Sequence, residues 1–578
     1  MNNNTINGLK YIWENPYYEN NIYQISDLAV SLNISIPIAT LLYNKGYKNK
    51  QDALLFLFPV YDSVIYNPKL MQHAELAVFR ILKAIENKEK ILICGDYDVD
   101  GITSTSLLLH ALLELKANVN FFLPHRVNDG YGLSPKVIER AKNSGYTLLI
   151  TVDNGTCAFE ALLKAKELAL DVIITDHHQP KDFPEGALYL VNPHQKDCAY
   201  PFKELAGVGV IFKVVSLLYE LLQIKIPNKI YELFLLGTIA DMVPLLGENR
   251  YWIKYSLEKL KHYDSSAISL LKKNAKLGDE KLLTSQDIAF SLAPQINALG
   301  RLDDPRNGVL FFIQDDIDLL KTISQQLSYL NIERKEKEKK SIHAILLEIE
   351  KEIIHPHDVG CIIKSSKDFP AGIIGLIAAK LNQQYHVPTC IFTENKNNIL
   401  KGSCRSIPKC NLFEILNNID PCLLISFGGH KAAAGLSLKK ENLMSFSDAF
   451  SKEVLNRCTK NDFQQKITID SFLELEEMNL KFWNDLTLLE PFGMDNAVPV
   501  FCINDIIISD IKIIKDIHVK ITVHSLEKKI SVIFFNRLDI INAAKINQKI
   551  SLLAKVTQNT WNEKINLELQ GVDLKIIS

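Results

Sequence analysis

Four short acidic segments each follow an apolar run in the first 241 residues of this chain. The apolar runs, each a candidate buried strand or core helix, are 91–94, 148–152, 172–175 and 233–240. The acidic segments that follow them are 96–101, 153–155, 176–178 and Asp241. Ligands bind at the carboxyl ends of the strands in an open parallel sheet, so we expect these side chains to converge. Because crowded carboxylates repel unless a cation lies among them, the pattern predicts a metal site.

Composition sets the class of protein. The 578 residues suffice for several domains with their own cores, and 47% hydrophobic with 23% charged residues is typical of globular chains. The N-terminus lacks the pattern of a secretory signal, and no apolar run reaches about 18 residues, so we predict a cytoplasmic protein without a membrane span. Ten cysteines without a CxxC pair predict reduced thiols rather than a zinc ribbon or a disulfide framework.

Net charge restricts how nucleic acid could be bound. A net charge of -2 argues against a protein that coats nucleic acid by bulk charge. It leaves room for a local basic groove, because an acidic metal site and a basic channel cancel in the sum.

The periodicity of the chain predicts an α/β protein with several domains. Residues 1–75 resemble a leader that packs on the first domain. From 76 to 316, helical and strand signals alternate, which predicts a mostly parallel sheet covered by helices on both faces. Apolar residues at helical spacing predict one long bridging helix over 317–357, whose charged run 333–340 we interpret as a solvated face.

The second half of the chain predicts two further domains. Residues 358–455 read as a smaller, glycine-rich α/β domain. Over 465–578 the signal changes to short alternating strands separated by turn residues. That pattern predicts a small closed barrel of the oligonucleotide-binding (OB) type.

The acidic segments resemble the first four motifs of the DHH phosphoesterase superfamily. The matching residues are 95–104, 153–155, 176–178 and 237–241. Within the superfamily, the resemblance is closest to the bacterial single-strand-specific exonucleases, through residues 129–134, 295–304 and 427–435. It spans nearly the whole chain in the family's order of DHH catalytic domain, bridging helix, DHHA1 domain and barrel. This ordered match weighs against the simpler alternative that the acidic segments are ordinary solvated turns.

The resemblance implies a site for two divalent ions. The implied ligands are Asp98, Asp100, Asp153, His177 and Asp241. In the family, the aspartate that corresponds to Asp153 bridges both ions. Carboxylate oxygens with one imidazole suit two Mn²⁺ or Mg²⁺ ions better than a structural zinc, and the histidine favours manganese. Two such ions can lower the pKa of a water and stabilise the attacking and leaving oxygens of a phosphoryl displacement.

Neighbours of these ligands are expected to act beside the metals. We place His178 on the scissile phosphate, where a hydrogen-bond donor offsets developing charge, and we expect Asp96 to orient a ligand or a water. Many members of the superfamily carry a histidine four residues before the aspartate that matches Asp98, where this chain has Cys94. A buried thiol is a poor partner for Mg²⁺, so we interpret Cys94 as a core residue.

The resemblance also implies a clamp for a terminal 5′-phosphate. The residues at the corresponding family positions are Arg126, Arg301, Ser403 and Arg405. Arginine forks and a hydroxyl are good phosphate ligands, and such a clamp would release mononucleotides stepwise from the 5′ end. His430 is expected to touch the adjoining backbone. The alternatives are structural salt bridges for Arg126 and Arg301 and a loop-capping role for His430.

The leading prediction is a metal-dependent 5′-to-3′ exonuclease that degrades single-stranded DNA in recombination and repair. The barrel would add a track on which unpaired bases stack, with Trp483, Phe492 and Lys520 as candidates, although core packing is favoured for the two aromatics. The expected partners are single-stranded DNA, a single-strand-binding protein and a RecQ-type helicase. We expect a monomer.

Two other functions stay open. One is a phosphodiesterase of the same superfamily that cleaves short oligonucleotides or cyclic dinucleotides, and residues 465–578 weigh against it because such enzymes usually lack the barrel. The other is a non-catalytic replication scaffold, which the presence of all five implied ligands disfavours.

Overall fold

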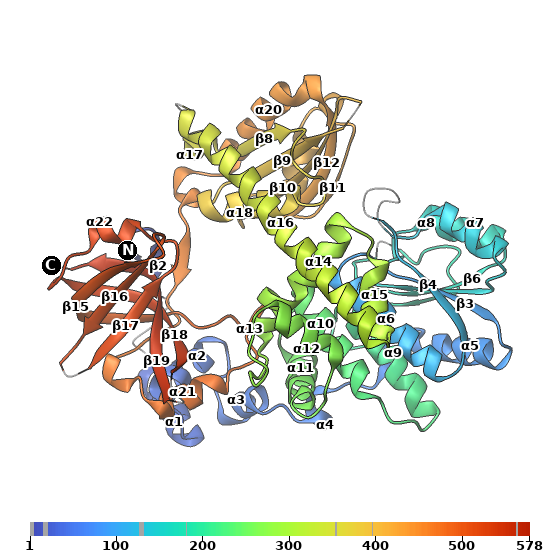
Figure 1. Ribbon diagram of the computed structural model, residues 1–578, viewed down its shortest axis with the longest axis horizontal. Helices are drawn as coiled ribbons and strands as arrows, with labels where there is room; N and C mark the ends of the chain where they lie inside the picture. Colours follow the sequence, from blue (N-terminus) through green and yellow to red (C-terminus); the bar gives the residue numbers. More distant parts are fainter. Residues whose placement is uncertain are drawn as a thin grey trace. The chain divides into compact units, whose positions relative to one another are not determined.

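The chain forms two compact units in this computed structural model (Figure 1). The structure describes residues 5–15, 21–125, 132–180, 182–352, 355–395, 397–526, 528–561 and 564–577. The larger unit comprises Tyr61–Cys458 and Gly493–Asn496, and the smaller comprises Met1–Val60, Thr459–Phe492 and Ala497–Ser578.

A five-stranded parallel sheet organises the first domain of the larger unit. Its order is β4 (Asn118–Phe122), β3 (Lys90–Cys94), β5 (Leu148–Val152), β6 (Asp171–Thr175) and β7 (Tyr189–Val191). All neighbouring strands are paired in parallel. The parallel sheet predicted from the alternating signals is confirmed.

Both faces of this sheet are covered by helices, which is why its central strands β3, β5 and β6 are mostly apolar. One face packs against α7 (Pro135–Asn143) and α8 (Phe159–Glu167), and the other against α5 (Ala74–Glu86), α6 (Val99–Glu114) and α9 (Gly207–Leu221). Alternate residues of each strand enter separate hydrophobic cores, as in parallel sheets generally. Cys94 is buried in the core beneath α7 and α8, which confirms its interpretation as a packing residue.

Helices complete this domain, one of them before the sheet in the sequence and the others after it. They are α4 (Tyr61–Val64), α10 (Asn228–Ala240), α11 (Gly247–Leu260), α12 (Ser266–Asn274), α13 (Ser285–Asp287), α14 (Ala293–Leu302) and α15 (Arg306–Ile313). The apolar run 233–240 is therefore the end of a core helix rather than a strand.

One long helix, α16 (Ile317–Lys351), follows; it begins where it was predicted and ends before residue 357, the predicted limit. The expectation that its charged run is a solvated face is wrong in part. Glu338 is buried, accepts a hydrogen bond from Arg334 at 3.0 Å and pairs with Lys380 of the next domain at 2.5 Å. The helix needs this pairing because a buried carboxylate without a partner would be costly.

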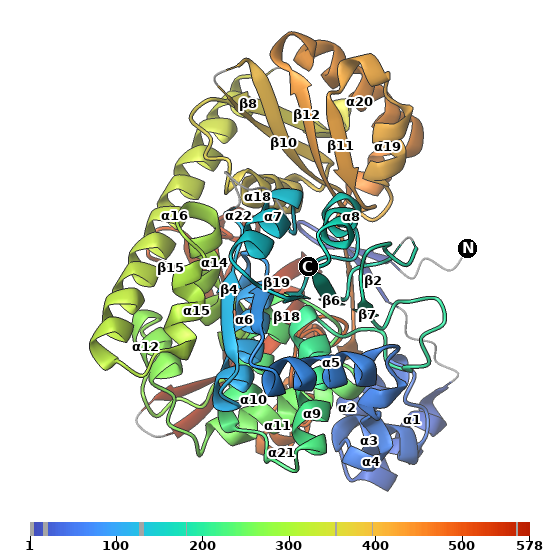
Figure 2. The same cartoon turned by 90° about the vertical axis from the view of Figure 1, so that its right-hand side faces the viewer.

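The next domain is a second, smaller α/β layer structure. Its sheet has the order β11 (Ser426–Gly429), β12 (Ala433–Lys439), β10 (Ile399–Arg405), β9 (Thr389–Glu394) and β8 (Ile362–Ser366). The helices are α17 (Pro356–Val359), α18 (Ile374–Tyr385), α19 (Leu412–Asn418) and α20 (Leu443–Arg457). Figure 2 shows α18, α19 and α20 beside this sheet.

Four cysteines of this domain form disulfides, Cys390–Cys404 and Cys410–Cys458. The prediction of uniformly reduced thiols is wrong for them. Antiparallel pairing of β9 with β10 places Cys390 directly opposite Cys404, a register that sequence spacing does not reveal.

The smaller unit contains a closed barrel. Its strands are β14 (Ser471–Phe472), β15 (Phe501–Ile514), β16 (His518–His524), β17 (Lys529–Phe534), β18 (Lys549–Trp561) and β19 (Lys564–Ile576), with helices α21 (Leu480–Thr487) and α22 (Asp539–Ala543). The sheet runs β14-β15-β16-β17-β19-β18, and a further pairing of β15 with β18 closes it. The predicted barrel is confirmed.

The first 60 residues belong to the barrel unit, so the prediction of a leader packed on the catalytic domain is wrong for 5–60. Strands β1 (Thr5–Asn7) and β2 (Ile12–Glu14) form a small sheet with β13 (Lys466–Thr468). The indole nitrogen of Trp13 donates to Asp573 at 2.9 Å, and both side chains are fully buried. Helices α1 (Ile22–Leu32), α2 (Ile36–Asn44) and α3 (Lys50–Leu57) follow.

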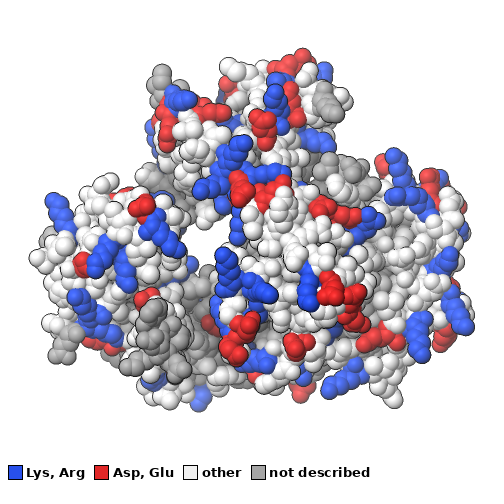
Figure 3. All heavy atoms as spheres, in the orientation of Figure 1, with Lys and Arg blue, Asp and Glu red and all other residues white. Residues whose placement is uncertain are grey.

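The surface charges and the hydropathy of the helices match the near-neutral net charge and the lack of long apolar runs in the sequence. Lysine and arginine side chains are interspersed with acidic ones on the face drawn in Figure 3. Among the described residues, no single helix is long and apolar enough to cross a bilayer, whereas α1 and α2, bent by 114° at their junction, meet that criterion only as a pair.

Candidate metal centre

The acidic segments converge at the carboxyl edge of the parallel sheet. The first follows β3, the second follows β5 and the third follows β6, while Asp241 caps the end of α10. Asp98 is the N-cap of α6 and accepts a hydrogen bond from the Gly101 amide at 3.0 Å. The predicted convergence, which includes Asp98 and Asp241 at 143 positions apart in the sequence, is therefore present.

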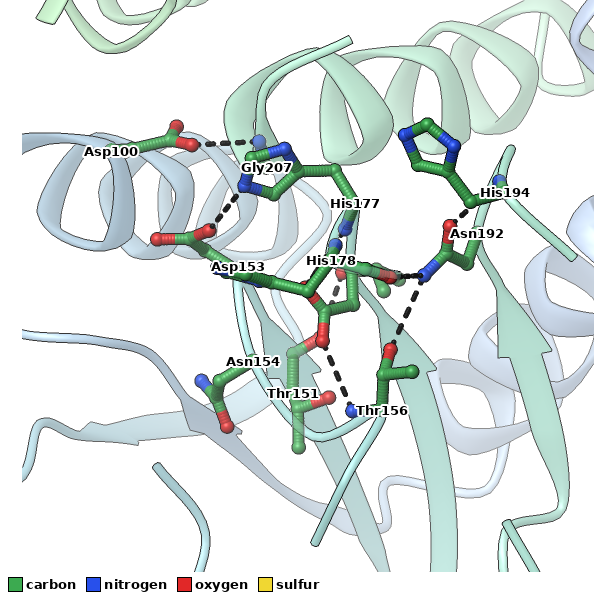
Figure 4. A network of polar contacts seen from close by, with 12 residues as sticks. Asp100, Thr151, Asp153, Asn154, Thr156, His177, His178, Asn192, His194 and Gly207 are labelled. Carbon is green, nitrogen blue, oxygen red and sulfur yellow. Dashed lines mark hydrogen bonds and ion pairs between the residues drawn. The ribbon is translucent and has the colours of Figure 1, made fainter. Parts of the chain in front are cut away.

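Three groups of side chains bring potential ligand atoms within 4.8 Å of one another. They are Asp96 with Asp98 and Asp153, Asp100 with His177 and Asp241, and Asp153 with His177 and His178. All five implied ligands occur in these groups, and Asp153 and His177 each occur twice. Figure 4 shows Asp100, Asp153 and His177 pointing toward one another. Asp96 and His178 also lie within reach of the same centre.

The N-terminus of α9 holds the carboxylate of Asp100. The amides of Gly207 and Val208 donate to its two oxygens at 2.7 and 2.8 Å (Figure 4). The first amides of a helix have no partner within the helix and carry partial positive charge, so they suit a buried carboxylate. Oδ2 accepts from Gly207 and keeps a second lone pair for a cation, whereas Oδ1 also accepts a hydrogen bond from the Ser104 hydroxyl at 3.4 Å.

Asp153 occupies a strained turn at the middle of the centre. Its φ of 60° is uncommon for a residue other than glycine, and it directs the carboxylate toward the imidazole Nε2 of His177 at 3.3 Å. The same imidazole lies 3.7 Å from Asp241. A Cβ on Gly207 would lie 2.5 Å from the Cβ of Asp153, so glycine is required for this approach.

Electrostatics show that the centre lacks positive charge. Burial, together with Asp98, raises the pKa of Asp100 to about 7 despite its two amide donors. Burial and neighbouring carboxylates also raise the pKa of Asp153 and of Asp241 well above the ordinary value. A divalent cation would remove this penalty, because it neutralises several carboxylates at once. Hard oxygens with an imidazole fit Mn²⁺ or Mg²⁺.

The pKa values of the two histidines are shifted in opposite directions. Burial and the neighbouring His178 lower the pKa of His177 to about 4, so its ring is neutral and can act as a ligand. Burial opposes protonation of His178 too, but the hydrogen bond and charge of Asp176 raise its pKa. Asp176 Oδ1 lies 2.7 Å from the Nδ1 of His178, and although burial acts against it, this contact lowers the pKa of Asp176 to about 2.

A second polar cluster contains three of the predicted clamp residues. Ser403 and Arg405 lie on β10 beside the N-terminus of α18, since a Cβ on Gly375 would be 3.1 and 3.2 Å from their side chains. The Arg301 guanidinium donates to the carbonyl of Gly372, just before α18, at 3.1 Å. Two arginines, a hydroxyl and a helix N-terminus together form a suitable anion site.

His430 lines the same cavity as His178, and this cavity has a volume of about 610 Å³. The expected contact of His430 with the adjoining DNA backbone stays a prediction. Arg126, the remaining clamp candidate, and residues 126–131 lie outside the described residues. Of the barrel candidates, Phe492 is buried and Trp483 is half-buried on α21.

Sequence reasoning missed the groups that orient the ligands. No role was predicted for Asp176, although it fixes His178, or for Asn192, which donates to the carbonyl of His178 at 2.8 Å. It also missed the Gly207–Val208 amides. Two glycines at 207 and 209 in an otherwise apolar stretch were the available signal for a close approach, whereas a single asparagine carries none.

Comparison with protein families finds three matching domains. Residues 90–238 match the DHH family, N-terminal domain, residues 358–456 match the DHHA1 domain, and residues 469–573 match the RecJ OB domain. The single-stranded-DNA-specific exonuclease RecJ of Bacillus subtilis (strain 168) is 33% identical over 556 residues, which cover 96% of this chain and 70% of that protein.

Solved structures give the same relationship. RecJ from Thermus thermophilus in complex with Mn²⁺ superposes with a TM-score of 0.82 at 24% identity, over 97% of this chain and 79% of that one, which shows a shared fold. An exonuclease RecJ bound to manganese has a TM-score of 0.59 at 26% identity, over 68% of this chain and 98% of that one.

Proposed function

Because this chain belongs to the RecJ family of single-stranded-DNA-specific exonucleases, we propose that it hydrolyses single-stranded DNA from the 5′ end and releases 5′-mononucleotides. The observation that carries this proposal is the convergence of Asp98, Asp100, Asp153, His177 and Asp241 at one sheet edge. Its buried carboxylates carry raised pKa values, as expected for a site built around cations.

Those five residues are the proposed ligands of two Mn²⁺ or Mg²⁺ ions, with Asp153 shared between them. When bound, the ions would activate water and stabilise the oxygens of an in-line phosphodiester displacement. The residues of the chain supply the rest. Asp176 raises the pKa of His178 and directs its ring, which favours a donor that faces the scissile phosphate as charge develops there. Asp96 is close enough to Asp98 and Asp153 to orient them or to join the ligands.

The second cluster supplies the proposed preference for an end. Arg301, Ser403 and Arg405 with the first turn of α18 would bind a terminal 5′-phosphate, which the middle of a strand lacks. Burial lowers the pKa of Arg405, but a guanidinium stays charged at neutral pH. His430, across the cavity from His178, would contact the next phosphate.

The wider biological setting remains a prediction. A monomer in the cytoplasm, working in recombination and repair beside a single-strand-binding protein and a RecQ-type helicase, is consistent with the family. The proposed domain limits are 76–316 for catalysis, 317–357 for the bridge, 358–455 for substrate binding and 465–578 for the OB barrel.

A digestion series with purified protein and Mn²⁺ tests the proposal. The substrates are 5′-phosphorylated and 5′-hydroxyl oligonucleotides, single- and double-stranded, together with circular single-stranded DNA. We expect mononucleotides from the phosphorylated single strand, no cutting of the circle, and a rate about 100-fold or more lower for Asp153→Asn. The matched control is Asp197→Asn, an exposed aspartate of the same domain, which should keep full activity. Equal cutting of the circle would exclude recognition of the end, and an active Asp153→Asn would exclude the metal mechanism.

A further inference from the structure

One short backbone segment, residues 204–208, contacts three of the five proposed ligands. Two of its amides bind the carboxylate of Asp100, and the carbonyl of Leu205 accepts a hydrogen bond from His177. Gly207 also packs against Asp153. The position of this segment therefore sets the position of most of the metal centre.

Asp241 lies on a different segment. It ends α10, and the chain then turns through residues 242–246 before α11 begins at Gly247. Met242 and Gly247 both have positive φ values, so the connection is a tight, non-repetitive loop. Asp241 lies within reach of the other proposed ligands only if this loop stays at a fixed position relative to residues 204–208.

The side chain of Asn249 joins the two segments. Its Nδ2 donates to the carbonyl of Glu204 at 2.5 Å and to the carbonyl of Pro244 at 3.1 Å. Asn249 is fully buried in the first turn of α11. One buried amide group thus joins the segment that contacts three proposed ligands to the loop that follows the fourth.

The residue before Asn249 anchors the same turn of α11. Glu248 is fully buried, accepts a hydrogen bond from Tyr200 at 2.5 Å and pairs with Lys213 of α9, which is itself buried. Because α9 begins at Gly207, this pair connects α11 to the helix whose first amides hold Asp100. Asn249 therefore extends from a rigid base, and its two hydrogen bonds have a fixed geometry.

We propose that Asn249 is a positioning residue that keeps Asp241 in register with the other metal ligands, and so sets the affinity of the centre for its divalent ions. The inference rests on the proposed function, since it takes the five side chains as ligands. It assigns to Asn249 no contact with substrate or metal.

Direct Mn²⁺ binding to the metal-free full-length protein tests this role. Isothermal titration with Mn²⁺ alone is carried out on the wild type, Asn249→Leu and Gln295→Leu. Gln295 is the matched control, because it is a buried amide that also donates to two backbone carbonyls, those of Leu271 and Ser291. We expect Asn249→Leu to weaken Mn²⁺ binding about tenfold or more, as for other groups that orient ligands, while Gln295→Leu binds as the wild type does.

A milder variant and a second readout separate positioning from general loss of stability. Asn249→Ser keeps one donor and should bind Mn²⁺ with intermediate affinity. For both Asn249 variants, saturating Mn²⁺ should restore most of kcat, and hydrogen exchange of residues 241–247 should accelerate in the metal-free protein. If Asn249→Leu does not fold, Asn249→Ser is judged by the same measurements.

The possible failures are distinguishable. A wild-type protein that binds no Mn²⁺ would overturn the proposed function itself. Wild-type affinity in the Asn249 variants, or an equal loss in Gln295→Leu, would overturn the positioning role alone.

Discussion

Asp100→Asn should stabilise the metal-free protein at alkaline pH and destabilise it at acid pH. Asp100 is buried, and its pKa is raised from 3.8 to about 7. A carboxyl whose folded-state pKa is raised contributes stability that is complete below its unfolded value and is lost as pH rises through the folded value. At about 1.4 kcal/mol per pKa unit, the ionised group opposes folding by about 4 kcal/mol near pH 8.

The substitution also has a cost. Asparagine has one acceptor oxygen where the carboxylate has two, so one of the Gly207 and Val208 amides loses its partner, which costs about 1–3 kcal/mol. The net gain for Asp100→Asn near pH 8 is about 1–3 kcal/mol. Near pH 4.5 the relieved penalty falls to about 1 kcal/mol, so the same variant should be equal to or less stable than the wild type.

Urea unfolding in the presence of a chelator measures this effect. Hydrogen exchange of the α6 amides reports the unit that contains Asp100 separately from the barrel. Asp197→Asn provides the control and should show no difference at either pH. Mn²⁺ at a hundredfold excess over its Kd should stabilise the wild type by about 2.7 kcal/mol and should stabilise the variant by less. Lower stability of Asp100→Asn at both pH values would refute the electrostatic account of the centre.

Three further substitutions test the other parts of the site. Asp176→Asn removes the partner that raises the pKa of His178, so the alkaline limb of the pH–rate profile should move to lower pH. An unchanged alkaline limb would show that His178 does not take part in the reaction. Gly207→Ala introduces a Cβ 2.5 Å from the Cβ of Asp153, so Mn²⁺ titration should show an affinity lower by about tenfold or more. Unchanged Mn²⁺ affinity would argue against the close packing of Gly207 on Asp153. Arg405→Lys should reduce kcat/KM by about 10-fold or more on 5′-phosphorylated strands and little on 5′-hydroxyl strands, and an equal loss on both would place Arg405 outside the clamp.

The sequence sufficed to predict the parts of the fold that depend on local patterns. Strand β5 and helix α16 follow from short apolar runs and helical spacing, and the convergence of the acidic segments follows from their positions after apolar runs. The groups that orient the ligands were beyond reach, because they act through backbone atoms or through a lone buried amide such as Asn249. The assignment of residues 5–60 failed for a related reason, since the pairing of Trp13 with Asp573 leaves no periodic signal.

That pairing has a consequence for the order in which the polypeptide matures. Trp13 and Asp573 are 560 positions apart, and the whole larger unit is translated between them. During synthesis the larger unit can fold as soon as it leaves the ribosome. The amino-terminal strands can be buried only after the C-terminal residues of the chain have been translated. Their closing indole-to-carboxylate bond would then mark the final stage of assembly.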